Sequence, residues 1–466
     1  MTQSIFIQVG QCGNQIGHRF WDLALREHAA TNKSGRFDDS MQTFFYPTKT
    51  SGIRARSILI DMEEGVVRSL LRSPIGGLFE NAHFVTDLPG SGNNWSVGYY
   101  EHGTKHSRKI IEAIRKSAEL CDCLQCFFIL HSMGGGTGSG LGSFVTELLA
   151  DNFPEVFKIV TAVFPSIDDD VITSPYNTVL AIDKLTDLAD CVISVENGAL
   201  ENIVNRIHKV IQDGKDKHIS ISGSVIDGAG SIAGGKSRAF DEVNNIVANM
   251  LLNLTSSARY PGTMNVDLNE ISMNLVPFPR LHYLIAAQSP FESYSSVVAP
   301  RNIDQIFQDV YSRAYQLIST NPLEHTILAT ALLLRGPGCA SDIRRNIDRL
   351  RERLRFVDWN REGWKVGHCY ISPVGQKTGA LLALSNSTAI TPPFTSLRER
   401  MNRLLRRKAH LHHYSLGSNG NFDAFSALNQ ADESLSNLIN AYEFFNNSCN
   451  KETCLDERTP VIKIAE

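Results

Sequence analysis

The run Gly134–Gly140 constrains the fold of this chain more than any other feature of its sequence. It holds five glycines in seven residues, after the apolar run Cys126–His131 and before a helix-length segment that begins at Leu141. Glycine lets the backbone turn sharply and approach a bound group closely. Free amides at a helix start point at an anion, which the helix dipole also favours. The junction therefore predicts a phosphate-binding loop rather than a simple hinge.

The first 200 residues alternate between short apolar runs and helix-length segments. The apolar runs are rich in Ile, Val and Phe without polar alternation, as in strands that are covered on both faces. We predict strands at Ser4–Val9, Ser57–Met62, Cys126–His131, Phe157–Phe164 and Cys191–Val195. We predict helices at Gln11–Ala29, His106–Ala118, Leu141–Asp151 and Tyr176–Leu188. This order predicts an α/β fold with a doubly wound, mostly parallel sheet that binds its ligand at the carboxyl ends of the strands.

The pattern changes after residue 211. Gly, Ser, Asp and Lys dominate the next segment, whereas Phe240–Ser257 has an apolar stripe at helical spacing. Later we predict strands at Met273–Phe278, His282–Ala287 and Ala329–Leu334, and helices at Ile303–Ile318, Ser396–Tyr414 and Phe425–Asn446. The expected units are a Rossmann-like nucleotide-binding domain (1–211), a surface insertion (212–238), a core helix (239–258), a mixed α/β intermediate domain (259–390), a C-terminal helical hairpin (391–446) and a mobile tail (447–466).

Composition narrows the classes of function. Apolar residues make up 42% of the chain and charged residues 20%, which is typical of folded globular proteins. The sequence has no long apolar run and no basic, cleavable N-terminus, so we expect neither a membrane span nor a secretory signal. Nine scattered cysteines fit a cytosolic thiol state.

Residues 341–408 hold 15 Lys and Arg against 6 acids, which fits a solvated basic face or a docking surface for an acidic protein. Without aromatic platforms we expect no nucleic-acid binding.

A second glycine-rich segment offers an alternative phosphate site. Gly230–Ser237 matches the pattern G-x-x-x-x-G-K-[ST], which is typical of P-loops. A P-loop normally leaves a buried strand, but here the preceding His218–Ala229 is mostly Ser, Gly, Asp and His. We therefore predict phosphate binding at Gly134–Gly140. Loss of nucleotide binding in Lys236→Ala would contradict that choice.

Several segments together resemble the tubulin family, and they come in the family's order. They are Gly10–Gly17, Asp61–Glu63, Gly90–Trp95, Gly134–Gly140, Asp170–Asn177, Gly262–Glu270, Asn274–His282 and Arg406–Tyr414. The similarity covers about residues 3–446 and implies a tubulin-like fold. Within the family, the epsilon branch is the most similar at Cys121–Phe128, Asn245–Asn249 and Ala409–Tyr414.

The resemblance implies a site for GTP or GDP with Mg²⁺. The implied contacts to phosphate, sugar or base are Gln11, Cys12 and Gln15, with Asp170 on the ribose side. The residues implied to hold the phosphates are Asn93, Ser132, Gly134, Gly135, Gly136, Thr137, Gly138, Ser139 and Gly140. Asn197 and Asn244 would read the guanine edge, and Phe240 would stack on the base. Glu63 would position Mg²⁺ through water with Asp61 close by, since Mg²⁺ keeps several waters.

Asp267 and Glu270 are the implied reactive pair. A carboxylate there would orient water against the terminal phosphate held by the neighbouring subunit, so hydrolysis would depend on assembly. The implied partners are other tubulin subunits, through longitudinal contacts, and centriolar or basal-body proteins. The implied location is the cytoplasmic cytoskeleton, at the centrosome, centriole or basal body. An alternative is a nucleotide-stabilised, weakly hydrolysing adaptor that binds another tubulin without forming filaments.

Overall fold

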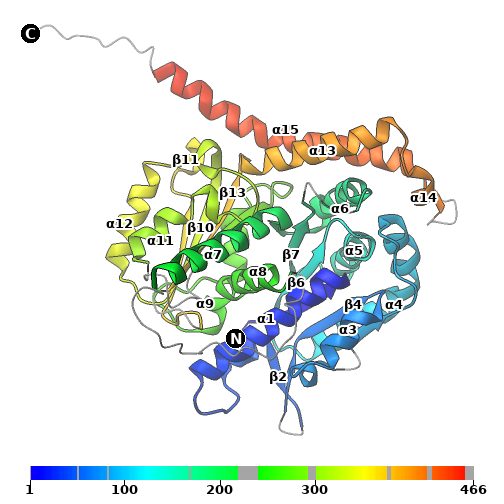
Figure 1. Cartoon of the computed structure of the whole chain (residues 1–466), viewed down its shortest axis with the longest axis horizontal. Helices are drawn as coiled ribbons and strands as arrows, with labels where there is room; N and C mark the ends of the chain where they lie inside the picture. The colour runs from blue at the N-terminus through cyan, green and yellow to red at the C-terminus, as the bar shows by residue number, and fades with distance from the viewer. Residues whose placement is uncertain are drawn as a thin grey trace, which may run out of the picture.

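The computed structural model describes residues 2–49, 52–80, 83–166, 169, 171–218, 240–291, 301–374, 379–416 and 422–456. One large twisted sheet runs through the centre of the molecule (Figure 1). Its strands are β1 (Gln3–Val9), β4 (Ser57–Asp61), β5 (Phe84–Thr86), β6 (Leu124–Ser132), β7 (Phe157–Phe164), β8 (Cys191–Glu196), β9 (Tyr283–Ser289), β10 (Thr326–Arg335), β11 (Arg355–Phe356), β12 (Trp364–Cys369) and β13 (Ala380–Ser387). A separate hairpin pairs β2 (Phe45–Pro47) with β3 (Ile53–Ala55).

The strand order is β11-β10-β13-β9-β8-β7-β6-β1-β4-β5, with β12 beside β10. Every pairing from β5 to β9 is parallel. β13 lies antiparallel between β9 and β10, whereas β11 and β12 pair parallel with β10. The predicted α/β fold with a mostly parallel sheet is confirmed. The pairing of β8 with β9 makes one sheet of the two regions that the sequence suggested as separate α/β units.

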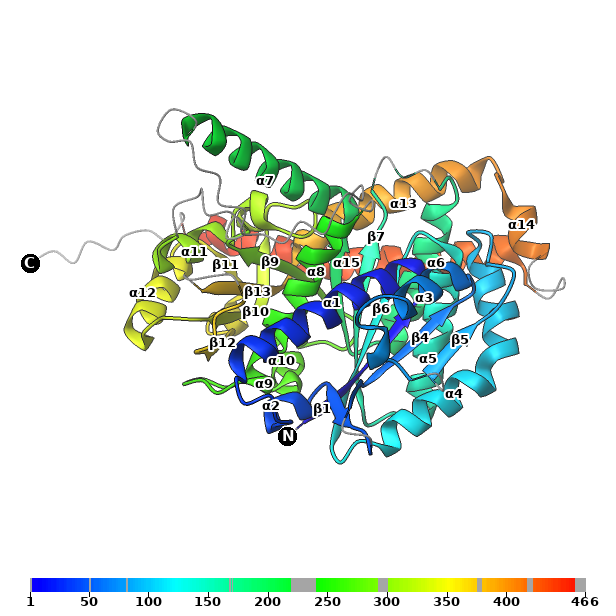
Figure 2. The same ribbon diagram turned by 60° about the horizontal axis from the view of Figure 1, so that its bottom comes forward.

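Helices cover both faces of this sheet. Successive residues of β1 point to opposite faces, so Ile5 and Ile7 enter one hydrophobic core and Phe6 enters the other. The first core is covered by α4 (Thr104–Glu119), α5 (Gly142–Asn152), α6 (Ser174–Leu188), α13 (Thr391–Arg406) and α15 (Ala424–Asp456). The second is covered by α1 (Gly10–Thr31), α3 (Glu64–Leu71), α7 (Asn197–His218), α8 (Asp241–Leu254) and α10 (Leu268–Leu275). Figure 2 shows α1 and α8 crossing in front of the strands.

The two long C-terminal helices, α13 and α15, lie side by side across one face of the molecule (Figure 1). The predicted helix Ser396–Tyr414 is divided, because Lys408 and His410 adopt left-handed backbone angles that interrupt the helix after Arg406. The short helix α14 (Leu411–Leu416) follows. Helix α15 continues to Asp456, so the expected mobile tail begins as helix, and its last ten residues lie outside the described part.

Three other sequence predictions differ from the structure. The predicted strand Met273–Phe278 is wrong, because Leu268, Ile271 and Leu275 are buried at helical spacing in α10. The predicted helix Ile303–Ile318 ends at Asp309, where the chain turns so that Leu317 can donate a backbone hydrogen bond to Ala286 of β9. Helix α7 continues to His218, into the expected insertion. The rest of that insertion and the Gly230–Ser237 pattern lie outside the described residues.

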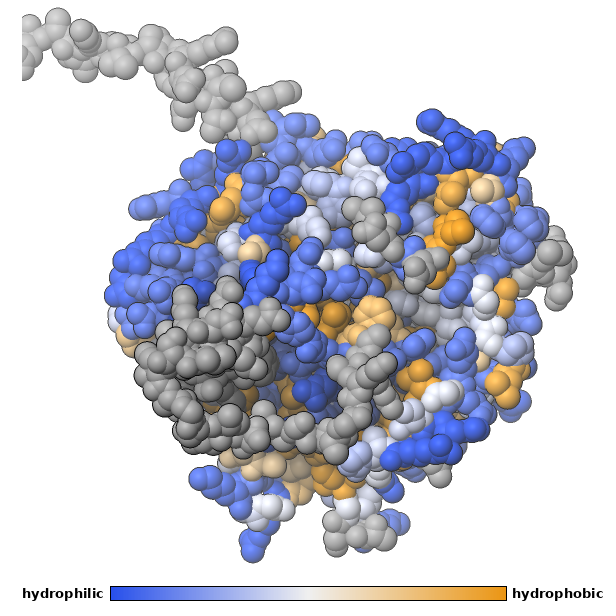
Figure 3. Space-filling view, viewed as in Figure 1, coloured by the Kyte–Doolittle hydropathy of each residue, from blue (hydrophilic) through white to orange (hydrophobic). Residues whose placement is uncertain are grey.

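The surface seen in the first orientation is mainly hydrophilic, with scattered hydrophobic patches (Figure 3). Within the part of the chain that the structure describes, no helix combines the length and the apolar character needed to cross a bilayer.

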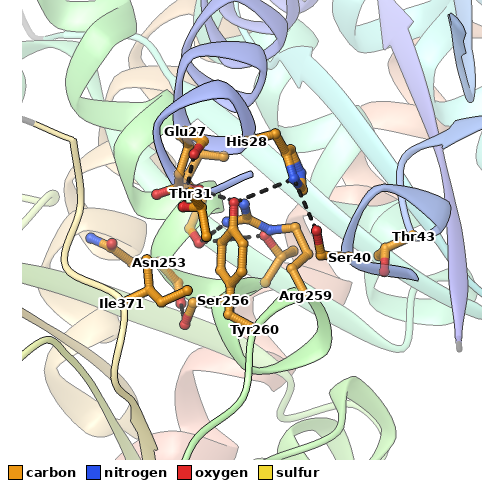
Figure 4. Close-up of polar contacts among 12 residues, drawn as sticks. Glu27, His28, Thr31, Ser40, Thr43, Asn253, Ser256, Arg259, Tyr260 and Ile371 are labelled. Carbon is orange, nitrogen blue, oxygen red and sulfur yellow. Dashed lines mark hydrogen bonds and ion pairs between the residues drawn. The ribbon is translucent and has the colours of Figure 1, made fainter. Parts of the chain in front are cut away.

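A buried ion triad joins helix α1 to elements that are far from it in the sequence. Glu27 of α1 accepts hydrogen bonds from Arg259 of α9 (Ser256–Arg259) and from Arg335 of β10, and all three side chains are almost fully buried. Arg259 also donates to the Leu252 carbonyl at 2.8 Å. Burial by itself would raise the pKa of Glu27, but the two guanidinium groups lower it to about 2. Figure 4 shows Glu27, Arg259 and Tyr260 converging beneath α1.

Candidate functional site

A cavity of about 270 Å³ opens at the carboxyl ends of successive strands of the parallel sheet. Its walls come from residues at or just after the ends of β1, β4, β6, β7 and β8, together with Asn93 of the loop after β5 and with the start of α8. The lining residues are Gln11, Cys12, Gln15, Asp61, Glu63, Asn93, Ser132, Gly134, Gly135, Gly136, Thr137, Gly138, Val163, Pro165, Asp169, Val171, Asn197, Phe240 and Asn244. The cavity therefore lies where an open parallel sheet binds its ligand.

The glycine-rich loop leaves β6 at Ser132 and enters a single π-helical turn, Thr137–Leu141, before α5. Its glycines serve two purposes. A Cβ on Gly138 would lie 2.7 Å from the Ser132 carbonyl oxygen, and one on Gly140 would lie 2.2 Å from the Trp95 carbonyl oxygen. A Cβ on Gly135 would meet nothing closer than 3.8 Å. Gly138 and Gly140 thus allow close packing, whereas Gly135 leaves open space at the cavity.

Two predicted phosphate contacts lie behind the cavity wall. Ser139 is fully buried, and its hydroxyl donates to the Gly135 carbonyl within the loop. Gly140 is also buried and packs against the backbone of Trp95. Both residues hold the shape of the loop and do not face the cavity. Of the other sequence-predicted residues, Asp170 lies outside the described part of the chain.

Asn177 of α6 connects two of the cavity loops and was not predicted from the sequence. Its amide group donates to the backbone carbonyls of Asn93 and Gly134, each at 2.8 Å. Its carbonyl oxygen accepts from the Trp95 amide at 3.0 Å and from the Tyr414 hydroxyl at 2.6 Å. Asn177 is fully buried, so these four bonds satisfy its polar atoms. It fixes the loops that carry Asn93 and Gly134 relative to each other.

Asp61 and Glu63 provide two carboxyl groups at the cavity wall. Asp61 is buried, and its Oδ1 accepts from the Glu63 amide at 3.2 Å. Its Oδ2 is also buried and has no hydrogen-bond partner among the described residues. Burial raises the pKa of Asp61 to about 7. A buried carboxylate oxygen without a partner beside a second carboxylate fits a hydrated divalent cation that has oxygen ligands.

Comparison with known proteins identifies the family. Residues 3–205 match the model of the Tubulin/FtsZ family GTPase domain, and residues 279–399 match the Tubulin C-terminal domain. The chain is 50% identical to the tubulin epsilon chain of Mus musculus and 49% identical to that of Homo sapiens, each over 95% of this chain and 96% of the relative. It is 31% identical to a tubulin beta chain of Porphyra purpurea, over 89% and 87% of the two chains.

The chain belongs to the tubulin family. The predicted resemblance, including the greater similarity to the epsilon branch, is confirmed. The GTPase domain of a tubulin binds a guanine nucleotide, so GTP or GDP is assigned to this chain.

The side of the cavity away from the glycine-rich loop carries planar and amide groups. Asn197 begins α7, and Asn244 lies in the first turn of α8. Phe240 precedes α8 with φ +74° and ψ 0°, and it is half exposed. A left-handed backbone is uncommon for a bulky residue and stores strain where it occurs. In this tubulin the left-handed backbone of Phe240 lets its aromatic ring line the cavity together with the amide side chains of Asn197 and Asn244.

Four further residues line the cavity but were not among the sequence predictions: Val163, Pro165, Asp169 and Val171. They follow or end β7, which the sequence had predicted as a buried strand. The rule that ligands bind at the carboxyl ends of parallel strands would have pointed to them.

The two predicted catalytic acids lie far from this cavity. Asp267 caps the start of α10 and accepts a hydrogen bond at 2.5 Å from Gln125, at the amino end of β6. Ser132 lines the cavity at the carboxyl end of β6, and the strand between spans roughly 23 Å. Glu270 is half exposed and pairs with the Lys365 ammonium at 2.7 Å, which lowers its pKa. Neither acid can reach a nucleotide in its own subunit's cavity.

Proposed function

We propose that this tubulin holds GTP or GDP in the cavity at the carboxyl ends of its parallel strands, with the phosphates against Gly134–Gly138. The observation that carries this proposal is the cavity itself, which joins a glycine-rich helix start to two carboxyl groups and to an amide-rich wall. Amides at a helix start bind anionic oxygens, and glycine lets those oxygens approach. Asn197 and Asn244 supply donors and acceptors for a guanine edge, and Phe240 supplies a stacking surface.

Mg²⁺ would bind between the carboxylates and the phosphates. The unpartnered buried oxygen of Asp61 and the neighbouring Glu63 support this location. Mg²⁺ prefers oxygen ligands and keeps several waters, so two carboxylates are sufficient protein ligands. The ion would neutralise phosphate charge, while the residues of this chain fix where the phosphates lie.

Gly135→Val tests the phosphate assignment. A Cβ at Gly135 would lie at least 3.8 Å from the rest of the fold, and Gly135 lines the cavity, so the valine should obstruct the phosphates with little change in packing. We expect at least roughly tenfold weaker binding of a fluorescent GTP analogue, equal to about 1.4 kcal/mol, with unchanged circular dichroism. Gly77→Val is the matched control, since Gly77 is exposed and has nothing near its Cβ position. Unchanged affinity in Gly135→Val would contradict the assignment.

Hydrolysis would be completed by a neighbouring subunit. Glu270 is exposed at the end of the sheet opposite the cavity, where it can meet the nucleotide of the next subunit in a head-to-tail arrangement. Such a heterologous contact leaves one cavity and one Glu270 unsatisfied at the two ends, so further subunits can add by the same contact along a filament. A carboxylate there would orient the attacking water.

Glu270→Gln tests this role. It should bind nucleotide normally and lose most of the GTPase activity that candidate tubulin partners stimulate, because an amide cannot accept the water's proton. Glu362→Gln is the matched control, since Glu362 is exposed and paired with a single cation, Arg351, as Glu270 is with Lys365. Equal stimulation in wild type and Glu270→Gln would exclude this role for Glu270.

The similarity to epsilon chains supports a structural role in the assembly or stability of centriolar or basal-body microtubules. A nucleotide-stabilised adaptor with little turnover is the second candidate, which the ion pair between Glu270 and Lys365 favours because it occupies the carboxylate. Localisation of the tagged chain together with a centriole marker tests the proposed role at centrioles or basal bodies.

Identifying the co-purifying tubulins and measuring whether they stimulate GTP hydrolysis separates the assembling GTPase from the adaptor. Stimulated turnover would exclude the adaptor.

A further inference from the structure

A cluster of two histidines and one aspartate lies outside the nucleotide cavity. Asp87 follows β5, His102 lies in the π-helical turn Val97–Gly103, and His106 lies in the first turn of α4. One ligand atom from each residue lies within 4.8 Å of those of the other two. The Nε2 atom of His106 is 2.8 Å from the Oδ2 atom of Asp87. No other group of three or more potential ligands comes this close among the residues that the structure describes.

The geometry of the cluster is suited to a metal ion. His102 and His106 are four residues apart on a continuous helical segment, so their rings share one face, with centroids 6.4 Å apart and planes within 16°. Two histidines at this spacing and one carboxylate form a common three-ligand set for Zn²⁺, with water as the fourth ligand. In a tetrahedral site neighbouring ligand atoms are about 3.3 Å apart. Small rotations of the three side chains would bring the present atoms to that spacing.

The burial of His102 separates this cluster from an ordinary surface ion pair. His102 is 3% exposed, and its Nδ1 atom is buried without a hydrogen-bond partner among the described residues. The pairing of Asp87 with His106 and Lys105 leaves that nitrogen unsatisfied. The ion pair of Asp87 therefore does not involve His102, whereas a metal ion bound by one of its ring nitrogens would join all three side chains.

We propose that Asp87, His102 and His106 bind a divalent first-row transition metal ion, with Zn²⁺ as the preferred ion. Imidazole and carboxylate ligands suit Zn²⁺, and the three ligands leave one position for water. Lys105 donates at 2.5 Å to the Oδ2 atom of Asp87, the oxygen that His106 also contacts. The Lys105 ammonium therefore competes with the metal for that oxygen. The side chain of Lys105 is more than half exposed and can turn into solvent when the metal binds.

The bound ion would connect the turn after β5 to the start of α4. Asp87 precedes the Gly90–Trp95 loop, which carries the cavity residue Asn93. The π-helical turn that holds His102 packs against the turn Thr137–Leu141 of the glycine-rich loop. The metal site would therefore stabilise the Gly90–Trp95 loop and the glycine-rich loop on their side away from the cavity.

Metal titration of the purified full chain tests the proposal. Cysteines are first blocked with N-ethylmaleimide, because Cys123 and Cys339 are exposed. Zn²⁺ affinity is then measured by competition with a fluorescent chelator in wild type, His102→Ala, His106→Gln and Asp87→Asn. We expect one tight site in wild type and more than roughly 100-fold weaker binding in each histidine variant. The visible absorption of Co²⁺ in the same site should be that of a four-coordinate ion without thiolate ligands.

Two further variants distinguish this site from Zn²⁺ binding elsewhere on the chain. Lys105→Met should tighten Zn²⁺ binding, because it removes the competing cation and leaves all three ligands. His412→Ala, in the separate histidine cluster near Tyr414, should leave the affinity unchanged. Equal Zn²⁺ affinity in wild type and the folded His106→Gln variant would overturn the proposal. Weaker binding in Lys105→Met would also overturn it, since that result would make Lys105 a supporting group.

Discussion

At the scale of single residues, Asn177 connects the cavity loops most directly. Four hydrogen bonds converge on its amide, from or to Asn93, Gly134, Trp95 and Tyr414. Each bond is modest by itself, but losing one partner in a buried network leaves the others unsatisfied.

Asn177→Leu should therefore lower both nucleotide affinity and stability. The substitution keeps the volume but removes the partner of the Gly134 carbonyl and of the Trp95 amide, and it removes the shorter of the two hydrogen bonds of the Tyr414 hydroxyl. We expect destabilisation of about 2–4 kcal/mol in urea unfolding and at least roughly tenfold weaker GTP binding. Asn402→Leu, at a part-buried amide on α13 that bonds Asp432, is the control. It should leave GTP affinity unchanged, and an equal loss of GTP affinity there would contradict the role of Asn177.

Glu27 gives a pH-dependent prediction. Its folded-state pKa of about 2 lies below the ordinary value of about 4.3, so the ionised form contributes stability above that ordinary value and loses it as the pH falls towards 2. Glu27→Gln leaves Arg259 and Arg335 buried without a counter-ion, which should cost about 3–5 kcal/mol at neutral pH. The difference between wild type and variant, measured by urea unfolding, should shrink in acid. A difference that stays constant down to about pH 3 would contradict the role of the ion triad.

The cavity residues show what the sequence alone could predict. Gln11, Asp61, Ser132 and Asn197 were assigned through the resemblance to tubulins, and each also stands at or just after a strand that the apolar pattern predicts. Asn177 could not be assigned its role, because its partners lie on three other segments and only the fold brings them together.

At the scale of elements, a short apolar segment can be read as a buried strand or as the buried face of a helix. The apolar residues of Met273–Phe278 suggested a strand, but Asp267 caps a helix that begins earlier and buries Leu268, Ile271 and Leu275. Strand β13 was not predicted, because Ala380–Ser387 consists of Ala, Leu, Ser and Asn and has none of the β-branched or aromatic residues that are typical of strands. Ends of elements were missed where a distant contact decides them, as at Leu317 beside β9.

At the scale of the whole molecule, a single sheet joins the two regions that match the GTPase and C-terminal models. One hydrophobic core contains residues of β1 and β6 as well as residues of α13 and α15. The two regions therefore share the same buried surface and should unfold together.

Hydrogen exchange measures this coupling. Peptides from β6 and β10 should show the same free energy of opening, because separating either region would expose the core that both share. The amino end of α13 should follow the same opening. A lower free energy for β10 than for β6 would show that the C-terminal region opens by itself.

Helix α1 carries one more consequence. Its first turns line the nucleotide cavity through Gln11, Cys12 and Gln15, and near its far end Glu27 is held by two buried guanidinium groups. With 22 residues it is about 33 Å long. The first turns of α1 are held as well, because Asn14 donates to the Ile60 carbonyl of β4 at 3.1 Å and Gly13 is buried. With both ends fixed, any displacement of the first turn by the phosphates would move the helix as a unit and so reach the buried ion triad at the other side of the subunit.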